Sequence, residues 1–169
     1  RMPRSLILTP TRELATQIAE NFEIYGKYNK LTMALLIGGV SMEEQTKKLD
    51  RGVDVLIATP GRLLDHFERG RILLNDIKVL VIDEADRMLD MGFIPDVEKI
   101  VSRLPKIRQT LFFSATMPPE IRRLSDAFLM NPKEVTVAPQ SRPAAETVTQ
   151  MLTVINQREK REALRRIIK

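Results

Sequence analysis

Short apolar segments alternate with longer amphipathic segments along most of the chain. Five segments are apolar at nearly every position, at residues 5–8, 33–37, 53–58, 79–82 and 110–113. Strands that are buried on both faces, as in a parallel sheet, have such continuous apolar runs. The segments between them have the length and pattern of helices, at about residues 10–28, 41–50, 60–69, 94–104 and 118–130. This alternation predicts right-handed βαβ units, and therefore a three-layer α/β sandwich around a mostly parallel sheet.

The pattern changes in the last quarter of the chain. Residues 138–147 are rich in proline, alanine and polar residues, which is typical of a linker. Residues 148–154 then alternate like a half-buried strand, and residues 158–169 have a helical pattern. We therefore expect a first domain over residues 1–137, a linker, and the first strand and helix of a second domain over 148–169. Since both ends of the chain are abrupt, we expect a fragment of a longer protein.

Composition limits the possible functions. The chain has 169 residues, of which 43% are hydrophobic and 29% charged, and it contains no cysteine. Disulfide frameworks, zinc fingers and thiol catalysis are therefore excluded, and no apolar run is long enough to span a membrane. The single histidine, His66, is interpreted as a structural or surface residue. Of the net charge of +5, residues 158–169 contribute four charges, with six basic and two acidic side chains. The overall basicity is therefore no evidence of a basic binding face.

The four-residue pattern T-P-x-R occurs twice, and each copy follows a predicted strand and opens a predicted helix. The copies are Thr9-Pro10-Thr11-Arg12 and Thr59-Pro60-Gly61-Arg62. Threonine is a good N-cap, and proline suits the first helical position. A helix N-terminus binds phosphate, and an arginine in its first turn adds a bidentate donor. Both starts lie at the carboxyl edge of a parallel sheet and could hold successive phosphates of one strand; the alternative is that each copy is only a cap.

Residues that could bind a ligand or take part in catalysis follow two other predicted strands. Gly38 and Gly39 follow the second apolar run, where paired glycines allow close approach of a ligand or form a plain turn. The fourth run ends in Asp83, Glu84 and Asp86, the arrangement of a Walker-B element. Asp83 could hold hydrated Mg²⁺, and Glu84 could polarise a water for attack on a γ-phosphate. The alternative is that Asp83 caps the following helix.

Hydroxyl side chains end the fifth run, at Ser114 and Thr116. They could bond the acids of the adjacent strand, in particular Asp86. The alternative is that they form the N-cap of the helix over 118–130, and both interpretations can hold together.

Taken together, these residues resemble the DEAD-box family of ATP-dependent RNA helicases. Asp83-Glu84-Ala85-Asp86 matches the motif that names the family, and the other matches are residues 10–15 with motif Ia, Gly38-Gly39 with the GG motif, residues 59–62 with motif Ib and residues 114–116 with motif III. Residues 86–93 further resemble the bacterial RhlE-type branch.

The resemblance implies a RecA-like domain of the P-loop NTPase type that binds ATP and Mg²⁺ and acts in the cytoplasm. RNA would be held through its backbone by Pro10, Thr11, Arg12, Gly38, Gly39, Thr59, Pro60, Gly61 and Arg62. It also implies that Asp83 and Glu84 serve the metal and the attacking water, and that Asp86, Ser114 and Thr116 couple nucleotide state to closure on RNA. RNA binding would be independent of sequence, and unwinding would be local.

The family's phosphate loop, A-x-x-G-x-G-K-T, does not occur in these 169 residues. We expect it, with the first strand of the sheet, to lie before Arg1. The parent protein would then be an RNA helicase, and this chain alone an inactive ATPase. The alternatives are a related motor acting on DNA and a non-catalytic RNA-binding or assembly module without a phosphate loop. The segment 148–154 could cover an exposed sheet edge, which suggests a strand-exchanged dimer.

Overall fold

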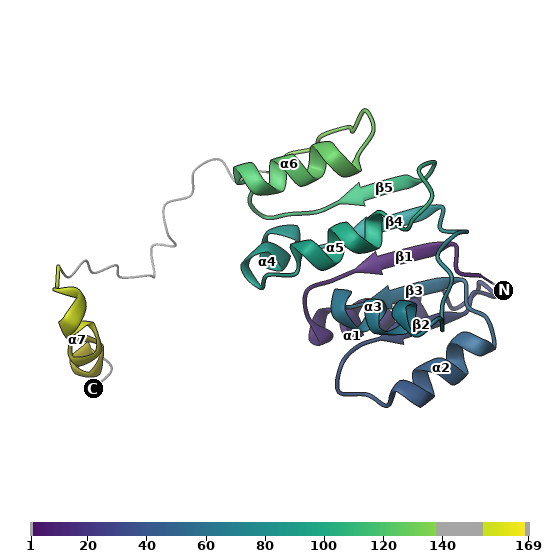
Figure 1. The fold of residues 1–169 in the computed structure, drawn as a ribbon, viewed down its shortest axis with the longest axis horizontal. Helices are drawn as coiled ribbons and strands as arrows, with labels where there is room; N and C mark the ends of the chain where they lie inside the picture. Colours follow the sequence, from purple (N-terminus) through teal and green to yellow (C-terminus); the bar gives the residue numbers. More distant parts are fainter. Residues whose placement is uncertain (1, 138–153, 168–169) are drawn as a thin grey trace. The chain divides into compact units, whose positions relative to one another are not determined.

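A computed structural model describes residues 2–137 and 154–167, drawn in colour in Figure 1. The chain divides into a first unit, residues 1–132, and a second unit, residues 133–169. The first unit contains the sheet and the residues of every motif described above, and the two units are described separately.

The first unit is built on a five-stranded sheet in which every pairing is parallel (Figure 1). The strands are β1 (Ser5–Leu8), β2 (Met33–Leu36), β3 (Val55–Ala58), β4 (Val79–Ile82) and β5 (Gln109–Phe112), in the order β2-β3-β1-β4-β5. All five predicted strands are confirmed within one or two residues at each end. The sequence predicts a mostly parallel sheet, and all pairings of the described strands are parallel.

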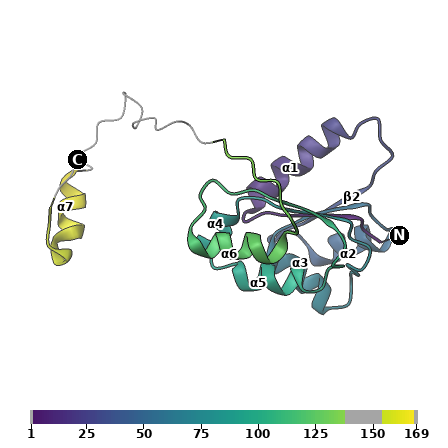
Figure 2. The ribbon, with the colours of Figure 1, turned by 90° about the horizontal axis from the view of Figure 1, so that it is seen from above.

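Helices cover both faces of this sheet (Figure 2). They are α1 (Arg12–Tyr25), α2 (Met42–Asp50), α3 (Pro60–Glu68), α4 (Ala85–Asp90), α5 (Ile94–Val101) and α6 (Pro119–Phe128). Figure 2 shows α1 on one face and the other helices of the unit on the opposite face, so the three-layer prediction is confirmed. The six residues of α4 are too few to show a helical period, and a helix there was expected only in the alternative that Asp83 is a cap.

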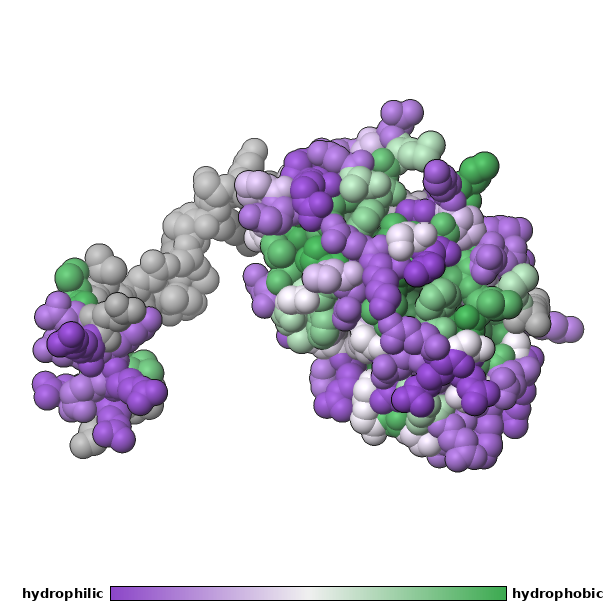
Figure 3. All heavy atoms as spheres, viewed as in Figure 1, coloured by the Kyte–Doolittle hydropathy of each residue, from purple (hydrophilic) through white to green (hydrophobic). Residues whose placement is uncertain are grey.

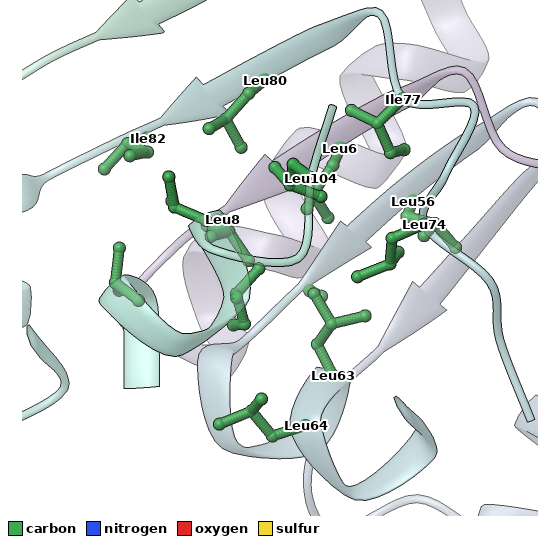
Figure 4. Close-up of a cluster of buried hydrophobic side chains, with 14 of the residues drawn as sticks. Leu6, Leu8, Leu56, Leu63, Leu64, Leu74, Ile77, Leu80, Ile82 and Leu104 are labelled. Carbon is green, nitrogen blue, oxygen red and sulfur yellow. The ribbon is translucent and has the colours of Figure 1, made fainter. Parts of the chain in front are cut away.

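The larger part of the core lies between the sheet and the helices α3 to α6. Alternate strand residues such as Leu6, Leu8 and Leu80 are fully buried there, in the same cluster as Leu63 of α3 (Figure 4). The α1 face holds a smaller cluster, in which Ala15 and Ala19 of α1 pack on Ile57 and neighbouring strand residues. Burial of both faces explains why the strands are continuously apolar.

The parallel register brings the carboxyl ends of all five strands to one edge of the sheet. The pairing continues just beyond the strands, because the amides of Thr9, Thr59, Asp83 and Phe113 each donate to a carbonyl of the neighbouring strand, at 2.8–3.1 Å. The residues that follow the strands are therefore neighbours at this edge, which we call the carboxyl edge. The predicted convergence of the motifs at a single edge is confirmed.

The second unit holds a short 3₁₀ helix (Gln157–Glu159) and α7 (Lys160–Ile167). No residue of α7 is buried, and its surface is mostly hydrophilic in Figure 3. The predicted linker and nearly all of the predicted strand over 148–154 lie outside the described residues, so the domain boundaries and the strand-exchanged dimer remain predictions. Among the described helices, none is long and apolar enough to cross a membrane.

Candidate nucleic-acid and nucleotide site

Both arginines of the T-P-x-R copies reach the same loop. This loop, residues 37–41, joins β2 to α2 and contains the glycine pair. Arg12 Nη1 donates to the Gly38 carbonyl at 3.4 Å, and Arg62 Nη1 donates to the Val40 carbonyl at 3.3 Å. The three RNA-binding segments predicted from the sequence are therefore in contact, although the contacts involve residues that are 26 and 22 positions apart.

The two copies open their helices differently. In the second copy Thr59 is the N-cap and Pro60 the first helical residue, as predicted, although the Thr59 side chain makes no capping hydrogen bond. In the first copy the N-cap is Thr11, whose Oγ1 accepts from the Leu14 amide at 3.2 Å. Thr9 is fully buried and donates its hydroxyl to the Thr11 carbonyl instead. The prediction that Thr9 caps the first helix is therefore wrong, because the helix begins two residues later than predicted, at Arg12.

The backbone and the surroundings of Gly39 favour glycine. Its φ is +78°, a conformation that L side chains rarely adopt. A Cβ at this position would lie 2.3 Å from Arg12 Nη1. Gly38 differs, since a Cβ there would meet nothing within 4 Å. Gly39 therefore allows the Arg12 guanidinium to lie directly against the loop backbone.

The acidic residues after β4 lie at the same edge in a strained turn. Glu84 has φ 51° and ψ 53°, the left-handed conformation, and it is the N-cap of α4. Its amide donates to Asp83 Oδ1 at 3.0 Å, and its carboxylate accepts from Arg87 at 3.1 Å. Asp83 is thus not the cap of the following helix, and the turn directs the two carboxylates to different partners.

The environment of Asp83 suits a bound cation. Burial raises the pKa of Asp83, the Glu84 amide lowers it and the Glu84 carboxylate raises it, and the net shift is upward. A cation beside this carboxylate would favour its ionised form. Within the described residues no group of three or more His, Cys, Asp or Glu side chains could enclose a metal. A single carboxylate nevertheless fits Mg²⁺, which keeps several waters and takes other ligands from substrate phosphates.

Asp86 bridges β4 and β5 by a set of hydrogen bonds. Its Oδ2 accepts from the Thr116 amide at 2.9 Å and from the Thr116 hydroxyl at 2.8 Å, while its own amide donates to Ser114 Oγ at 3.1 Å. Burial raises the pKa of Asp86, but the bonds from Thr116, Arg87 and Ser114 outweigh it, and the net shift is downward. The predicted bonding of these hydroxyls to the neighbouring acid is confirmed. The alternative of an N-cap at Ser114 or Thr116 is wrong, because α6 is capped at Pro118.

One buried polar pair was missed from the sequence. Gln45 of α2 and His66 of α3 are almost completely buried, and His66 Nε2 lies 2.9 Å from Gln45 Oε1. Gln45 Nε2 donates to the Ile37 carbonyl at 2.8 Å. No sequence signal joins a glutamine and a histidine 21 positions apart. Of the two interpretations of His66, as a structural or a surface residue, the burial agrees with the structural one and excludes the surface one.

Comparison with known proteins defines the class of fold and then the family. The fold matches that of a DEAD box protein from the hyperthermophile Methanococcus jannaschii, with a TM-score of 0.77 and 38% identity over 100% of this chain and 45% of that chain. The DEAD/DEAH box helicase family matches residues 1–124. The chain therefore has the RecA-like fold and belongs to the DEAD/DEAH box helicase family.

The similar curated proteins are much longer than this chain. It is 45% identical over 168 residues to DEAD-box ATP-dependent RNA helicase 40 of Oryza sativa subsp. japonica, covering 99% of this chain and 21% of that protein. It is 43% identical over 162 residues to ATP-dependent RNA helicase DBP2 of Eremothecium gossypii, covering 96% of this chain and 29% of that protein. These relatives come from plants and fungi, and so they give no support to the expected bacterial RhlE-type branch.

Proposed function

We propose that this chain serves an ATP-dependent RNA helicase, in which it holds the RNA backbone and supplies acidic residues to the site of ATP hydrolysis. The observation that carries the proposal is that Arg12 and Arg62, each at the start of a different helix, converge on one glycine loop at the carboxyl edge. The acidic residues after β4 follow a strand at the same edge. The names of the similar curated proteins, which are ATP-dependent RNA helicases, support the same activity.

RNA binding follows from the donors gathered around the loop. Each arginine uses one Nη1 group on a loop carbonyl, and a guanidinium has five N–H donors, so others remain for phosphate oxygens. The free amides at the starts of α1 and α3 add donors and a partial positive charge. Backbone contacts of this kind carry no sequence information, and binding should therefore be independent of RNA sequence.

ATP hydrolysis would use the turn after β4. Asp83 would hold Mg²⁺ through water, and the metal would neutralise charge on the nucleotide phosphates. Glu84 would orient and deprotonate the attacking water. To do so, its carboxylate would leave Arg87, which it contacts in this structure, and contact the water. The bonds of Asp86 with Ser114 and Thr116 would transmit nucleotide state across β4 and β5. A cytoplasmic location remains a prediction.

RNA affinity of the 169-residue chain tests the proposal directly. Fluorescence anisotropy would follow labelled oligouridine and oligoadenosine RNAs of about 15 nucleotides, with DNA of the same length as a comparison. We expect similar Kd values for the two RNAs. Arg12→Ala and Arg62→Ala should each weaken binding and reduce the salt dependence by about 0.7 in the logarithmic slope, because each removes one phosphate contact from a single strand. Unchanged affinity and slope in both variants would contradict the proposed RNA contacts.

ATP turnover tests the catalytic part. No phosphate loop occurs in these 169 residues, and we therefore expect this chain alone to release no phosphate from ATP, with or without RNA. RNA-stimulated phosphate release that Glu84→Gln abolishes would overturn this expectation.

A further inference from the structure

We propose that Gln45 and His66 are positioning residues that fix the loop of residues 37–41 in the conformation needed for RNA binding. This inference rests on the proposed function. It concerns a buried pair that touches neither RNA nor nucleotide. The pair would act through the backbone of the loop.

The pair connects the loop to two helices. Gln45 Nε2 donates to the carbonyl of Ile37 at 2.8 Å, and Ile37 is the residue before the glycine pair. Gln45 Oε1 lies 2.9 Å from His66 Nε2 on α3. Gln45 is 3% exposed and His66 is 0% exposed, so water does not compete for these bonds. In this environment a lost partner leaves a buried polar group unsatisfied.

The hydrogen bonds require a proton on Nε2 of the histidine. Gln45 must point its NH₂ group at the carbonyl, and its oxygen then faces His66, which must donate from Nε2. His66 Nδ1 carries the lone pair, and it is buried without a hydrogen-bond partner among the described residues. Charging the ring would add a buried N–H without an acceptor. Burial first, and then the charge of Arg62, lower the pKa of His66; Asp65 raises it, Arg69 lowers it by less, and the net shift is downward.

These contacts connect both ends of the loop to helices α2 and α3. The start of the loop is held by Gln45 of α2, which is held by His66 of α3. The same helix α3 carries Arg62, which donates to the Val40 carbonyl near the other end of the loop. Apolar side chains of similar size would fill the same volume, but only the polar pair fixes the position of the Ile37 carbonyl. We infer that the pair sets where the loop and its arginine contacts lie.

Gln45→Met tests this role, because it preserves the length of the side chain and removes both hydrogen bonds. The matched control is Thr46→Val, the neighbouring position on α2, whose hydroxyl donates to the Met42 carbonyl at 2.9 Å. We expect Gln45→Met to raise the Kd for oligouridine by about 5- to 10-fold, as the loss of one or two hydrogen bonds predicts. Thr46→Val should change it less than about 2-fold, with both variants compared at equal folded fraction.

Three further measurements distinguish positioning from simple destabilisation. The chain has one histidine, and its ¹⁵N ring signals should report a neutral Nε2–H tautomer that shifts when RNA binds. In the variants, the effects of Gln45→Met and Arg62→Ala on Kd should be less than additive, since both act on the same loop. Amide exchange at Gly38 and Gly39 should be faster in Gln45→Met and unchanged in Thr46→Val.

The outcomes separate this inference from the proposed function. If the unmodified chain binds no RNA, the proposed function fails, and the positioning role fails with it. If the unmodified chain binds RNA but Gln45→Met binds equally well, or its effect adds fully to that of Arg62→Ala, then only the positioning role is overturned.

Discussion

Replacing Gly39 by alanine should separate RNA binding from stability. The left-handed backbone at φ +78° makes a side chain cost roughly 1–2 kcal/mol. The stiffer unfolded chain returns about 0.4–1 kcal/mol, which leaves a net loss of about 1 kcal/mol. The new Cβ would also lie 2.3 Å from Arg12 Nη1. Because the guanidinium is the end of a flexible side chain, it would move away, which adds little to the loss of stability and disrupts the phosphate site.

Gly70→Ala is the matched control for this variant. Gly70 has φ +64°, and a Cβ there would meet nothing within 4 Å. Both variants should therefore lose about 1 kcal/mol in urea unfolding, whereas only Gly39→Ala should weaken RNA binding, by about 5- to 10-fold for one charge-assisted contact. Equal RNA affinities in the two variants would refute the reasoning. The reasoning would also be refuted if Arg12→Ala weakened RNA binding as much in the Gly39→Ala variant as in the unmodified chain.

Two further predictions concern titration and the bridge between β4 and β5. Burial lowers the pKa of His66, so the unfolded chain takes up a proton near its ordinary value of 6.5 while the folded chain does not. The unfolding free energy should therefore fall below about pH 6.5, by at most about 1.4 kcal/mol per pH unit. His66→Leu should flatten this slope, and an equally steep slope in that variant would contradict it. Asp86→Ala should lower stability at neutral pH by about 1 kcal/mol through its lost bonds to Thr116. Because those bonds lower the pKa of Asp86, the difference from the unmodified chain should shrink as pH falls through about 3.8 and below, and a constant difference would exclude the carboxylate as the cause.

The strands and their common edge were predictable because both follow from one-dimensional patterns. Continuous apolar runs identify strands buried on both faces, and parallel strands bring their carboxyl ends together. The sequence accordingly predicts the correct edge for the motif residues Arg12, Gly39, Arg62 and Asp83.

Apart from the bonds between Asp86 and the hydroxyl residues after β5, the contacts themselves were not predictable, because they depend on geometry that the sequence does not encode locally. The start of α1 is two residues later than T-P-x-R suggests, since Thr11 provides the cap. The pairing of Gln45 with His66 joins two helices at positions distant in sequence, and no local pattern indicates the left-handed turn at Glu84. Such tertiary effects override local propensity.

The most direct test of the account is to map RNA onto the chain by ¹H–¹⁵N NMR during a titration with oligouridine. The largest shifts should occur at the amides of Arg12, Gly39 and Arg62, at the carboxyl edge of the sheet. Arg4 and Lys78, basic residues at the starts of β1 and β4 and so at the opposite edge, should stay unchanged. Dominant shifts at Arg4 and Lys78, with none at the glycine loop, would contradict the account.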